Sequence, residues 1–378
     1  MRKIRILLLG ALSGACLFFL IERASVRAVS AGAVPSRDSE LLARVVNLIK
    51  DDYLEVKDPV QTMDGSFRGL VNSLDAGCAY LDAGSTTRYQ SQKSRTLRET
   101  GLILYKRFGA FPQVVGLIDN SPAAKAGIEI GDSVAEINGV GTAPMSLTEA
   151  NLFLCDTAAT PAAIKIVRED KTLEYKVDRV EIVTQPVSYL KRDGTAGILR
   201  VLRLTPAVAA DIKTSYAAAI RKLRKPLVLD LRGCSEGTLD AARELVNVFL
   251  KADSIGYIAG RGDSKETVSA VSAPALDKTP LIVWVDQATI GPAEAVAAVL
   301  KDFHRAKVVG LRTAGLVARE DFVPLDDGTS VLLTSGVFCL RSGTPLWGQG
   351  VEPDVKVESG TPDFDAFFKK TLGLLTSP

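Results

Sequence analysis

The sequence predicts an α/β protein whose main domain is built on a mixed sheet. From Val180 onward, strand-like apolar runs at 197–201 and 227–231 are separated by a segment of helical period at 206–223. A second observation is residues 101–168, where short strand-like runs are separated by glycine-containing turns. We therefore expect five regions: an export segment at 1–31, a helical region at 36–95, a β-rich domain at 97–180, an α/β core at 181–358 and a C-terminal tail helix at 359–378.

The N-terminal segment has the pattern of an export signal. Basic residues at Arg2, Lys3 and Arg5 precede an apolar run at 6–21, and small residues lead up to Ala31. Because the run is slightly short for a full span, a cleaved signal peptide and an uncleaved anchor both remain open. In the second case residues 6–21 tether the chain to the inner membrane. In both cases we expect an extracytoplasmic protein, in the periplasm or cell envelope.

The composition is that of an ordinary globular protein. The 378 residues are 47% hydrophobic and 24% charged, and the formal net charge is +2. This balance argues against nucleic acid as a partner. The cysteines Cys16, Cys78, Cys155, Cys234 and Cys339 show neither a metal-ligand spacing nor a disulfide framework. We therefore expect no metal and no other cofactor.

The helical region contains two apolar patterns of helical period. The first extends from Leu41 to Ile49 and the second from Met63 to Leu74, and they are followed by Ser-Leu-Asp-Ala-Gly-Cys-Ala-Tyr-Leu-Asp at 73–82. We expect two helices that lead into this last segment.

The β-rich domain carries several local signals. Asn120–Ile128 favours a short capped helix that ends at a glycine, and Asn138-Gly139 favours a hairpin turn. Ser146 and Glu149 form a capping box at the start of a second helix, and residues 162–168 are expected to be the closing strand.

This arrangement resembles a PDZ domain, through Ser-Pro-Ala-x-x-Ala-Gly at 121–127 and Gly-Asp-x-Val-x-x-Ile-Asn-Gly at 131–139. The resemblance implies a groove that takes a peptide as an added strand and holds its terminal carboxylate with backbone amides. Core packing is the alternative role for the apolar members of the groove. The expected groove residues are Gly101, Leu102, Ile103 and Leu104 on the strand side and Ala150, Asn151 and Leu154 on the helix side.

The segment 280–320 has a distinctive order of elements. A strand-like run at 281–285 is followed by a turn at 286–294 and a helix-like run at 295–303, and a second strand at 306–310 leads to Thr313-Ala314-Gly315-Leu316. The order resembles the catalytic core of the carboxyl-terminal processing peptidases, the tail-specific serine proteases. That family implies a crotonase-like α/β core, and the resemblance covers about residues 40–357.

The register of this resemblance is set by residues that share the family's spacing, which include Glu294, Asp302, Arg305 and Gly315. On that register the family's nucleophilic Ser falls on Gly291, its Lys base on Leu316 and its Gln on Glu320. A nucleophile needs a hydroxyl or thiol beside a base that accepts its proton, and glycine and leucine supply neither.

The expected oxyanion loop is also altered. Asp-Leu-Arg-Gly-Cys-Ser-Glu-Gly at 230–237 resembles the family's Asp-Leu-Arg-Asn-x-Pro-Gly-Gly, and Glu236 and Gly237 occupy the positions of its two glycines. A carboxylate at Glu236 disfavours nearby negative charge, and we expect strain if a residue other than glycine must adopt the backbone angles there.

Two functions follow from these residues. The first is an exported, catalytically inactive relative that binds protein or peptide C-termini through the PDZ-like domain, with an active peptidase as a further partner. The alternative is a working serine-type endopeptidase with non-standard residues, for which Thr289, Cys234 and His304 are the candidate groups. We expect structural roles for these three, since side chains must come within hydrogen-bond reach to act together.

Overall fold

The computed structural model describes residues 36–55, 58–92, 98–182, 185–192, 195–270, 274–358 and 363–376. The expected export signal at 1–31, with its apolar run at 6–21, lies outside these residues. Within the described part of the chain, we find no helix that is both long and apolar enough to cross a membrane.

The chain divides into two compact units, Met1–Gly65 and Ser66–Pro378. Helix α2 (Ser36–Asp52) lies in the first unit, and Leu41 and Leu48 on it are exposed. Helix α3 (Pro59–Asn72) crosses the division. Both helices correspond to the two helical patterns of the sequence.

The α/β core contains a mixed six-stranded sheet in the order β17-β14-β13-β10-β9-β8. Neighbouring strands are parallel except for the antiparallel pair β8–β9. Strands that are buried on both faces need continuous apolar runs, and β13 is buried at all five positions. The strands are β8 (Val187–Arg192), β9 (Ala196–Val201), β10 (Leu227–Asp230), β13 (Leu281–Val285), β14 (Lys307–Gly310) and β17 (Val355–Lys356).

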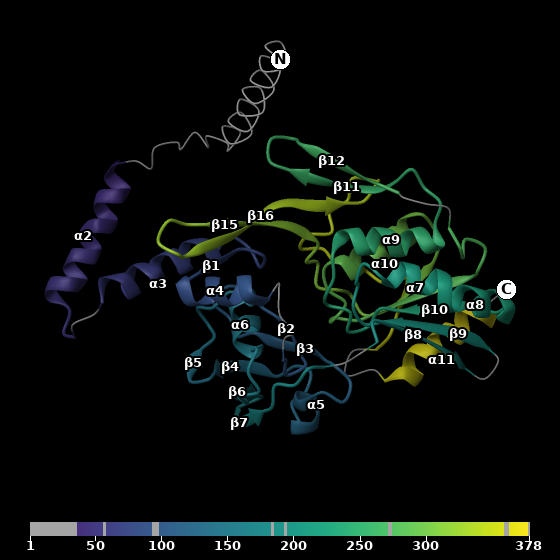
Figure 1. Cartoon of the computed structure of the whole chain (residues 1–378), viewed down its shortest axis with the longest axis horizontal. Coiled ribbons are helices and arrows are strands. Elements are labelled where there is room, and N and C mark those ends of the chain that lie inside the picture. The colour runs from purple at the N-terminus through teal and green to yellow at the C-terminus, as the bar shows by residue number, and fades with distance from the viewer. Residues whose placement is uncertain are drawn as a thin grey trace, which may run out of the picture. The chain divides into compact units, whose positions relative to one another are not determined.

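Helices cover both faces of this sheet, as Figure 1 shows for α9, α10 and α11. On one face Val283 and Val285 pack into a large cluster with residues of α9 (Leu239–Phe249) and α10 (Pro292–Asp302). On the other face Trp284 packs against Phe367 of α11 (Phe364–Thr376). The remaining helical elements of this part are α7 (Val208–Asp211), the π-helix η1 (Ile212–Tyr216) and α8 (Ala217–Leu223).

The small β domain, residues 98–182, has its own sheet and its own core. The strand order is β2-β3-β4-β6-β7, with β5 paired to β4, so β2 lies at an edge. Its core includes Val114, Ile137 and Ile164. The elements are β2 (Leu102–Tyr105), β3 (Gln113–Leu117), α5 (Pro122–Ala126), β4 (Ser133–Ile137), β5 (Val140–Gly141), α6 (Leu147–Leu154), β6 (Ala162–Arg168) and β7 (Lys171–Val177).

The local signals of this domain take the predicted forms. Ser121 caps α5 and Gly127 ends it in the left-handed conformation, at φ 86°. Asn138 and Gly139 both have positive φ, as a two-residue hairpin turn of type I′ requires. Ser146 and Glu149 form the capping box of α6. The expectation that 162–168 is the last strand is wrong, because β7 follows and pairs with β6 along its length.

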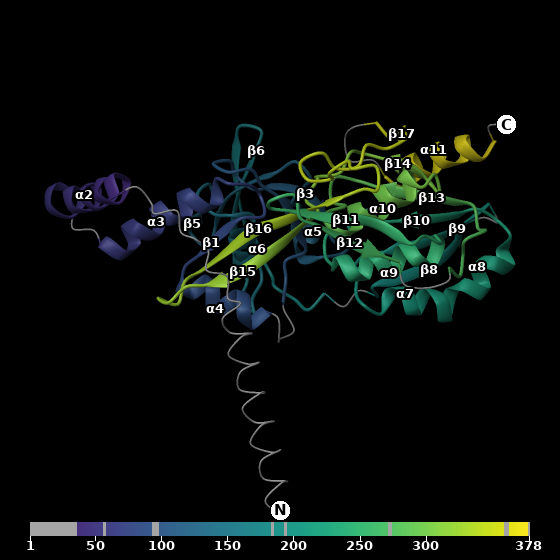
Figure 2. The same cartoon turned by 90° about the horizontal axis from the view of Figure 1, so that it is seen from above.

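A third sheet joins distant parts of the chain, as the pairing of β1 with β16 and the two views in Figures 1 and 2 show. The expected helical region therefore also contributes a strand, because β1 pairs with β16 from Ala79 to Leu81. Helix α4 (Ala83–Gln92) follows β1. The strands of this sheet are β1 (Ala79–Leu81), β11 (Ser254–Gly260), β12 (Lys265–Ser269), β15 (Ala318–Pro324) and β16 (Ser330–Cys339).

Candidate functional site

A cleft of about 860 Å³ brings together the three positions at which the sequence departs from the peptidase pattern. Gly291, Leu316 and Glu320 all line it, although they belong to a helix start, a loop and a strand. The other walls come from α6, from the start of α9, from β11, β12 and β16, and from Ala76 and Gly77.

Gly291 stands at a sharp turn between β13 and α10. Its backbone has φ 64° and ψ −125°, which residues with a side chain adopt only with strain. Strained strand-to-helix turns of this kind present the nucleophile in many hydrolases. A Cβ built on Gly291 meets nothing closer than 3.4 Å, at the Leu316 carbonyl oxygen. The turn therefore has the geometry and the space to present a side chain, but the residue has none.

Glu294 fixes this turn to the loop that carries Leu316. Its side chain is completely buried. One carboxylate oxygen accepts hydrogen bonds from the amides of Gly291 and Leu316, both at 2.8 Å. The other accepts from the Gly315 amide at 2.6 Å and from the Thr313 hydroxyl. Burial raises the pKa of Glu294, while these four donors act in the opposite direction. The position of Glu294 was predicted from the sequence, but its role depends on a loop that lies 19 to 22 residues further along the chain.

Leu316, at the position of the family's base, is partly buried in an apolar cluster. This cluster contains Ala288 and Ile290 from the turn before α10, together with Ile103 and Val115 from the small β domain. The two domains approach closely here, because a Cβ at Gly116 would lie 2.5 Å from the Cβ of Ala288. Leu316 is therefore held by packing, and its side chain cannot accept a proton.

Glu320, at the position of the family's Gln, lies on β15 and faces the cleft beside Gly77. A Cβ built on Gly77 would lie 2.9 Å from the Glu320 Oε1 atom. Desolvation, helped by the charge of Asp75, raises the pKa of Glu320 to about 7. The residue is nevertheless exposed to solvent.

Contacts of charged side chains hold the loop at 230–237 in place. Arg232 forms a bidentate ion pair with the Asp230 carboxylate, in which both N–O distances are 2.8 Å. Its guanidinium also lies 4.8 Å from the ring centre of Trp284. The Gly233 amide donates to Asp286 at 3.1 Å.

The two predicted oxyanion positions lie next to Leu204. The Leu204 amide donates to the carbonyl of Glu236 at 2.9 Å, and a Cβ on Gly237 would lie 2.4 Å from the Leu204 Cβ. The backbone strain expected at Glu236 is absent, since its φ is not positive. Its carboxylate lies 3.6 Å from the Arg203 guanidinium, and burial raises its pKa. Gly237 lines the cleft, whereas Glu236 does not.

The structure does not bring the three alternative catalytic groups together. Thr289 is buried, and its hydroxyl is committed to Leu231 and Asp286. Cys234 is buried as well, and desolvation raises its pKa. His304 is exposed beyond the C-terminal end of α10, and the 13 residues from Gly291 correspond to roughly 20 Å of helix.

Ser235 is a candidate site residue that was not predicted from the sequence. Ser235 lines both the cleft and a neighbouring groove. Its position in the altered loop at 230–237 is the signal in the sequence that could have suggested a place in the site. Neither lysine nor histidine occurs among the described residues that line the cleft, so no nitrogen base of those types stands beside it.

The neighbouring groove, about 650 Å³, lies between β2 and α6. Six of the seven predicted groove residues line it, and Ala150 does not. Ala150 is fully buried in the core of the small β domain, so its assignment to the groove is wrong. The groove and the cleft adjoin, since both are lined by Leu147, Asn151, Ser235 and Ile290.

The side chains of the predicted groove residues differ in how far they are exposed to the groove and to solvent. Leu104 and Leu154 are almost wholly buried, which fits the core-packing alternative for these two. Ile103 turns to the other face and packs on Ala288. Leu102 is half-buried and Asn151 is exposed, so these two offer side-chain surface to a ligand.

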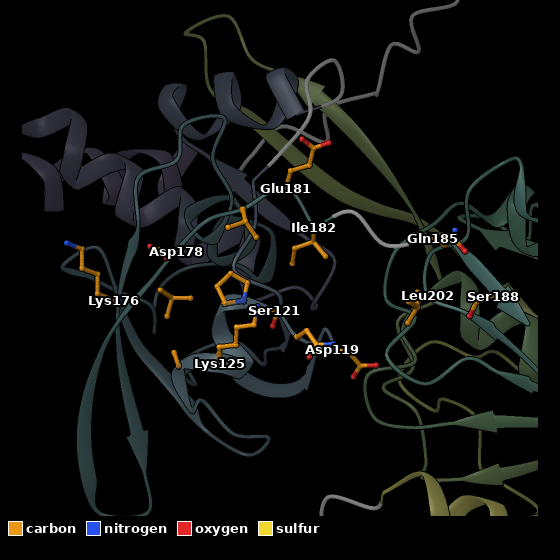
Figure 3. A pocket seen from close by; sticks show the side chains of 15 residues that line it. Asp119, Ser121, Lys125, Lys176, Asp178, Glu181, Ile182, Gln185, Ser188 and Leu202 are labelled. Carbon is orange, nitrogen blue, oxygen red and sulfur yellow. The ribbon is translucent and has the colours of Figure 1, made fainter. Parts of the chain in front are cut away.

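A third cavity, of about 790 Å³, is shown in Figure 3. Asp119, Lys125 and Lys176 of the small β domain line it, as do Ser188 and Leu202 of the α/β core. It contains none of the predicted site residues. We therefore place the candidate site in the cleft and the groove.

Comparison with known proteins finds similar proteins along most of the chain. Residues 195–357 match the model of Peptidase family S41. The chain is 28% identical over 334 residues to the carboxy-terminal-processing protease of Bartonella bacilliformis, covering 86% of this chain and 76% of that protein. It is 24% identical over 362 residues to the carboxy-terminal processing protease CtpA of Bacillus subtilis, covering 95% of this chain and 77% of that one.

Among solved structures, the photosystem II D1 C-terminal processing protease has a similar fold. The TM-score is 0.71 at 21% identity, over 87% of this chain and 90% of that chain. The family match covers the residues that carry the turn at Gly291, the loop at Leu316 and Glu320. Residues 195–357 are thus similar to Peptidase family S41, and most of the chain is similar to carboxy-terminal processing proteases.

Proposed function

We propose that this protein is a catalytically inactive S41 homologue that binds the C-termini of other proteins. The observation that carries the proposal is the composition of the cleft. The turn at Gly291 presents no side chain, and the facing position is Leu316, which is packed among apolar residues. Loss of a nucleophile or base costs on the order of 10⁶ in kcat in a serine protease.

The groove supports the binding part of the proposal. An edge strand has unpaired backbone groups along one side, and a peptide can add to it as a further strand. β2 is such an edge, and α6 stands beside it to form the other wall. We propose that the small β domain is a PDZ module and that the turn at Gly101 and Leu102 receives the peptide carboxylate. On this proposal the α/β core is crotonase-like.

The location and partners are also proposals. The export pattern at 1–31 supports an extracytoplasmic site, with tethering through residues 6–21 if that segment is retained. A tail-binding protein in that compartment competes with an active peptidase for its substrates or acts beside it as an adaptor. Separation of cell fractions, followed by mass spectrometry of the mature N-terminus, tests the location.

The second candidate is a working endopeptidase. It is favoured by the names of the relatives, all of which are proteases, and by the turn at Gly291, whose backbone geometry suits a nucleophile. It requires another attacking group, and Ser235 is the one with access to the cleft.

A cleavage assay separates the two candidates. The purified protein is incubated with an unfolded substrate protein that ends in an apolar residue with a free carboxylate. We expect no turnover above that of a heat-inactivated sample. Turnover that is lost on Ser235→Ala, Thr289→Ala or Cys234→Ala identifies a working nucleophile and overturns the proposal.

Peptide binding tests the groove independently of catalysis. A labelled peptide with a free apolar C-terminus is titrated with the protein and followed by fluorescence anisotropy, beside the same peptide amidated at its end. We expect the free form to bind at least about tenfold more tightly, since a charge-assisted interaction is lost on amidation. Equal affinities contradict the assignment of the groove.

A further inference from the structure

The charges that line the cleft are paired, with one exception among the residues that the structure describes. Arg243 contacts the Asp240 carboxylate at 3.2 Å, and Arg319 contacts Glu266 at 2.6 Å. Glu320 makes no hydrogen bond and no ion pair with the described residues. The cleft therefore contains one negative charge without a counter-charge.

The space beside this carboxylate is suited to a long side chain. Gly291 contributes no side chain, and Leu316 is shorter than the lysine of the family pattern. Leu239, Val268 and Trp347, which are all partly exposed, supply apolar surface along the same cleft. A lysine or arginine side chain buries its methylene groups on such a surface and keeps its charged end near an acidic group.

We propose that the cleft binds a lysine or arginine side chain of the captured tail, with the cationic group paired to Glu320. The inference rests on the proposed function, because it assumes that a peptide held in the groove continues into the adjoining cleft. The cleft that lacks catalytic groups then acts as a specificity pocket, which adds a requirement for a basic residue upstream of the C-terminus.

The groups around Glu320 support a cationic ligand. Asp75 adds negative charge from the segment after α3, and it accepts hydrogen bonds from Thr334 and from the amides of Gly77 and Cys78. Burial raises the pKa of the Tyr89 phenol on α4, and the charge of Glu320 adds to this effect. Among the described residues that line the cleft, the other charged ones are Arg319 on β15, Glu266 on β12, and Asp240 and Arg243 on α9.

The interaction should depend on pH in a defined direction. The pKa of Glu320 is raised to about 7 in the free protein, so the carboxylate is charged above that pH and neutral below it. A cation pairs with the charged form only. The preference for a basic side chain should therefore be full near pH 8.5 and lost near pH 5.5.

The test uses a series of peptides with the same free apolar C-terminus. Each carries either lysine or norleucine at one upstream position, and successive peptides move that position along the chain. Isothermal titration of the full-length protein at pH 8.5 should give, at one position, lysine binding about fivefold tighter than norleucine, which corresponds to about 1 kcal/mol. The ratio should fall to about one at pH 5.5.

Two variants make the test specific. Glu320→Gln should abolish the ratio of lysine to norleucine affinity. Asp321→Asn makes the same chemical change on the same strand, but Asp321 does not line the cleft, so the ratio should persist. Thermal unfolding of both variants checks that each is folded.

The possible failures are distinguishable. If the norleucine peptides bind in a carboxylate-dependent way and lysine gives no gain at any position, the groove stands and the basic-residue pocket is wrong. The pocket is also wrong if Glu320→Gln keeps the ratio. If no peptide binds better than its amidated form, the proposed function itself fails, and the inference falls with it.

Discussion

The turn at Gly291 and the groove beside β2 show two different relations between backbone and function. At the turn, Glu294 holds the backbone in a geometry suited to catalysis, although the residue at the turn has no side chain. At the groove, the edge strand and α6 form the wall with backbone groups, and side chains matter less. A site that depends on one hydroxyl loses its chemistry by a single substitution, whereas a site made from strand edges tolerates many.

The altered cleft has a frame that does not depend on a nucleophile. The carboxylate of Glu294 joins the turn to the loop at Leu316 without any contribution from a nucleophile. The apolar cluster of Leu316 and Ile103 then joins the loop to the small β domain. These contacts are structural, and they persist whether or not the protein hydrolyses peptides.

The largest expected effect comes from removing this carboxylate. Glu294→Ala leaves the amides of Gly291, Gly315 and Leu316 without partners in a buried site, so we expect a loss of roughly 3 kcal/mol or more in the free energy of unfolding. Chemical denaturation measures the change. Glu174→Ala, at an exposed position of the small β domain, is the control and should change stability by less than about 0.5 kcal/mol. A loss below about 1 kcal/mol for Glu294→Ala shows that the turn does not depend on this residue.

The next effect concerns the groove. Leu102→Asp places a carboxylate where the peptide carboxylate is expected, so affinity for a peptide with a free C-terminus should fall at least about tenfold. Fluorescence anisotropy measures it. Thr172→Asp introduces the same charge on β7, at the opposite edge of the sheet, and should leave affinity near that of the unmodified protein. Equal effects of both substitutions place the peptide elsewhere.

A smaller effect on stability is expected at the turn, where a substitution distinguishes backbone strain from side-chain crowding. Gly291→Ala has room for its Cβ, but φ is 64°, so we expect a loss of about 1–2 kcal/mol in stability. Gly69→Ala, in α3 with no neighbour within 4 Å of its Cβ, should instead stabilise the protein by about 0.5–1 kcal/mol. If both substitutions stabilise, the turn is not strained.

The smallest expected effect is the contribution of Glu320 to pH-dependent stability. Its pKa in the folded state is about 7 and lies above the ordinary value, so the folded chain binds more protons between those values. Its contribution therefore favours folding as the pH falls from about 8 to 5. Denaturation at several pH values should show that the free energy of unfolding gains less from this fall in pH in Glu320→Gln than in the unmodified protein. An equal gain in the free energy of unfolding in both proteins contradicts the raised pKa of Glu320.

Much of the local structure could be predicted because its causes are local. The capping box at Ser146 and the turn at Asn138-Gly139 depend on neighbouring residues only. The convergence of Gly291, Leu316 and Glu320 on one cleft could be expected from their spacing relative to Glu294 and from the family resemblance, and the structure brings them together.

The features that were missed depend on long-range contacts. The pairing of β1 with β16 joins segments about 250 residues apart, and no local pattern predicts it. Ala150 and Asn151 are adjacent on α6, and only the packing of the helix decides that the first is buried and the second exposed. Likewise, the role of Glu294 and the contact between Leu316 and Ile103 follow from the way the loop and the small β domain pack on the turn.

The most direct test of the central claim asks whether a captured tail leaves the protein unchanged. A peptide with a free apolar C-terminus is mixed with a molar excess of the purified protein and held at 37 °C. The peptide is then recovered, and its molecular mass is measured by mass spectrometry. The account predicts that the peptide is bound and that all of it keeps its original mass. Shortened products that accumulate with time, and that disappear with Ser235→Ala, would show a working peptidase.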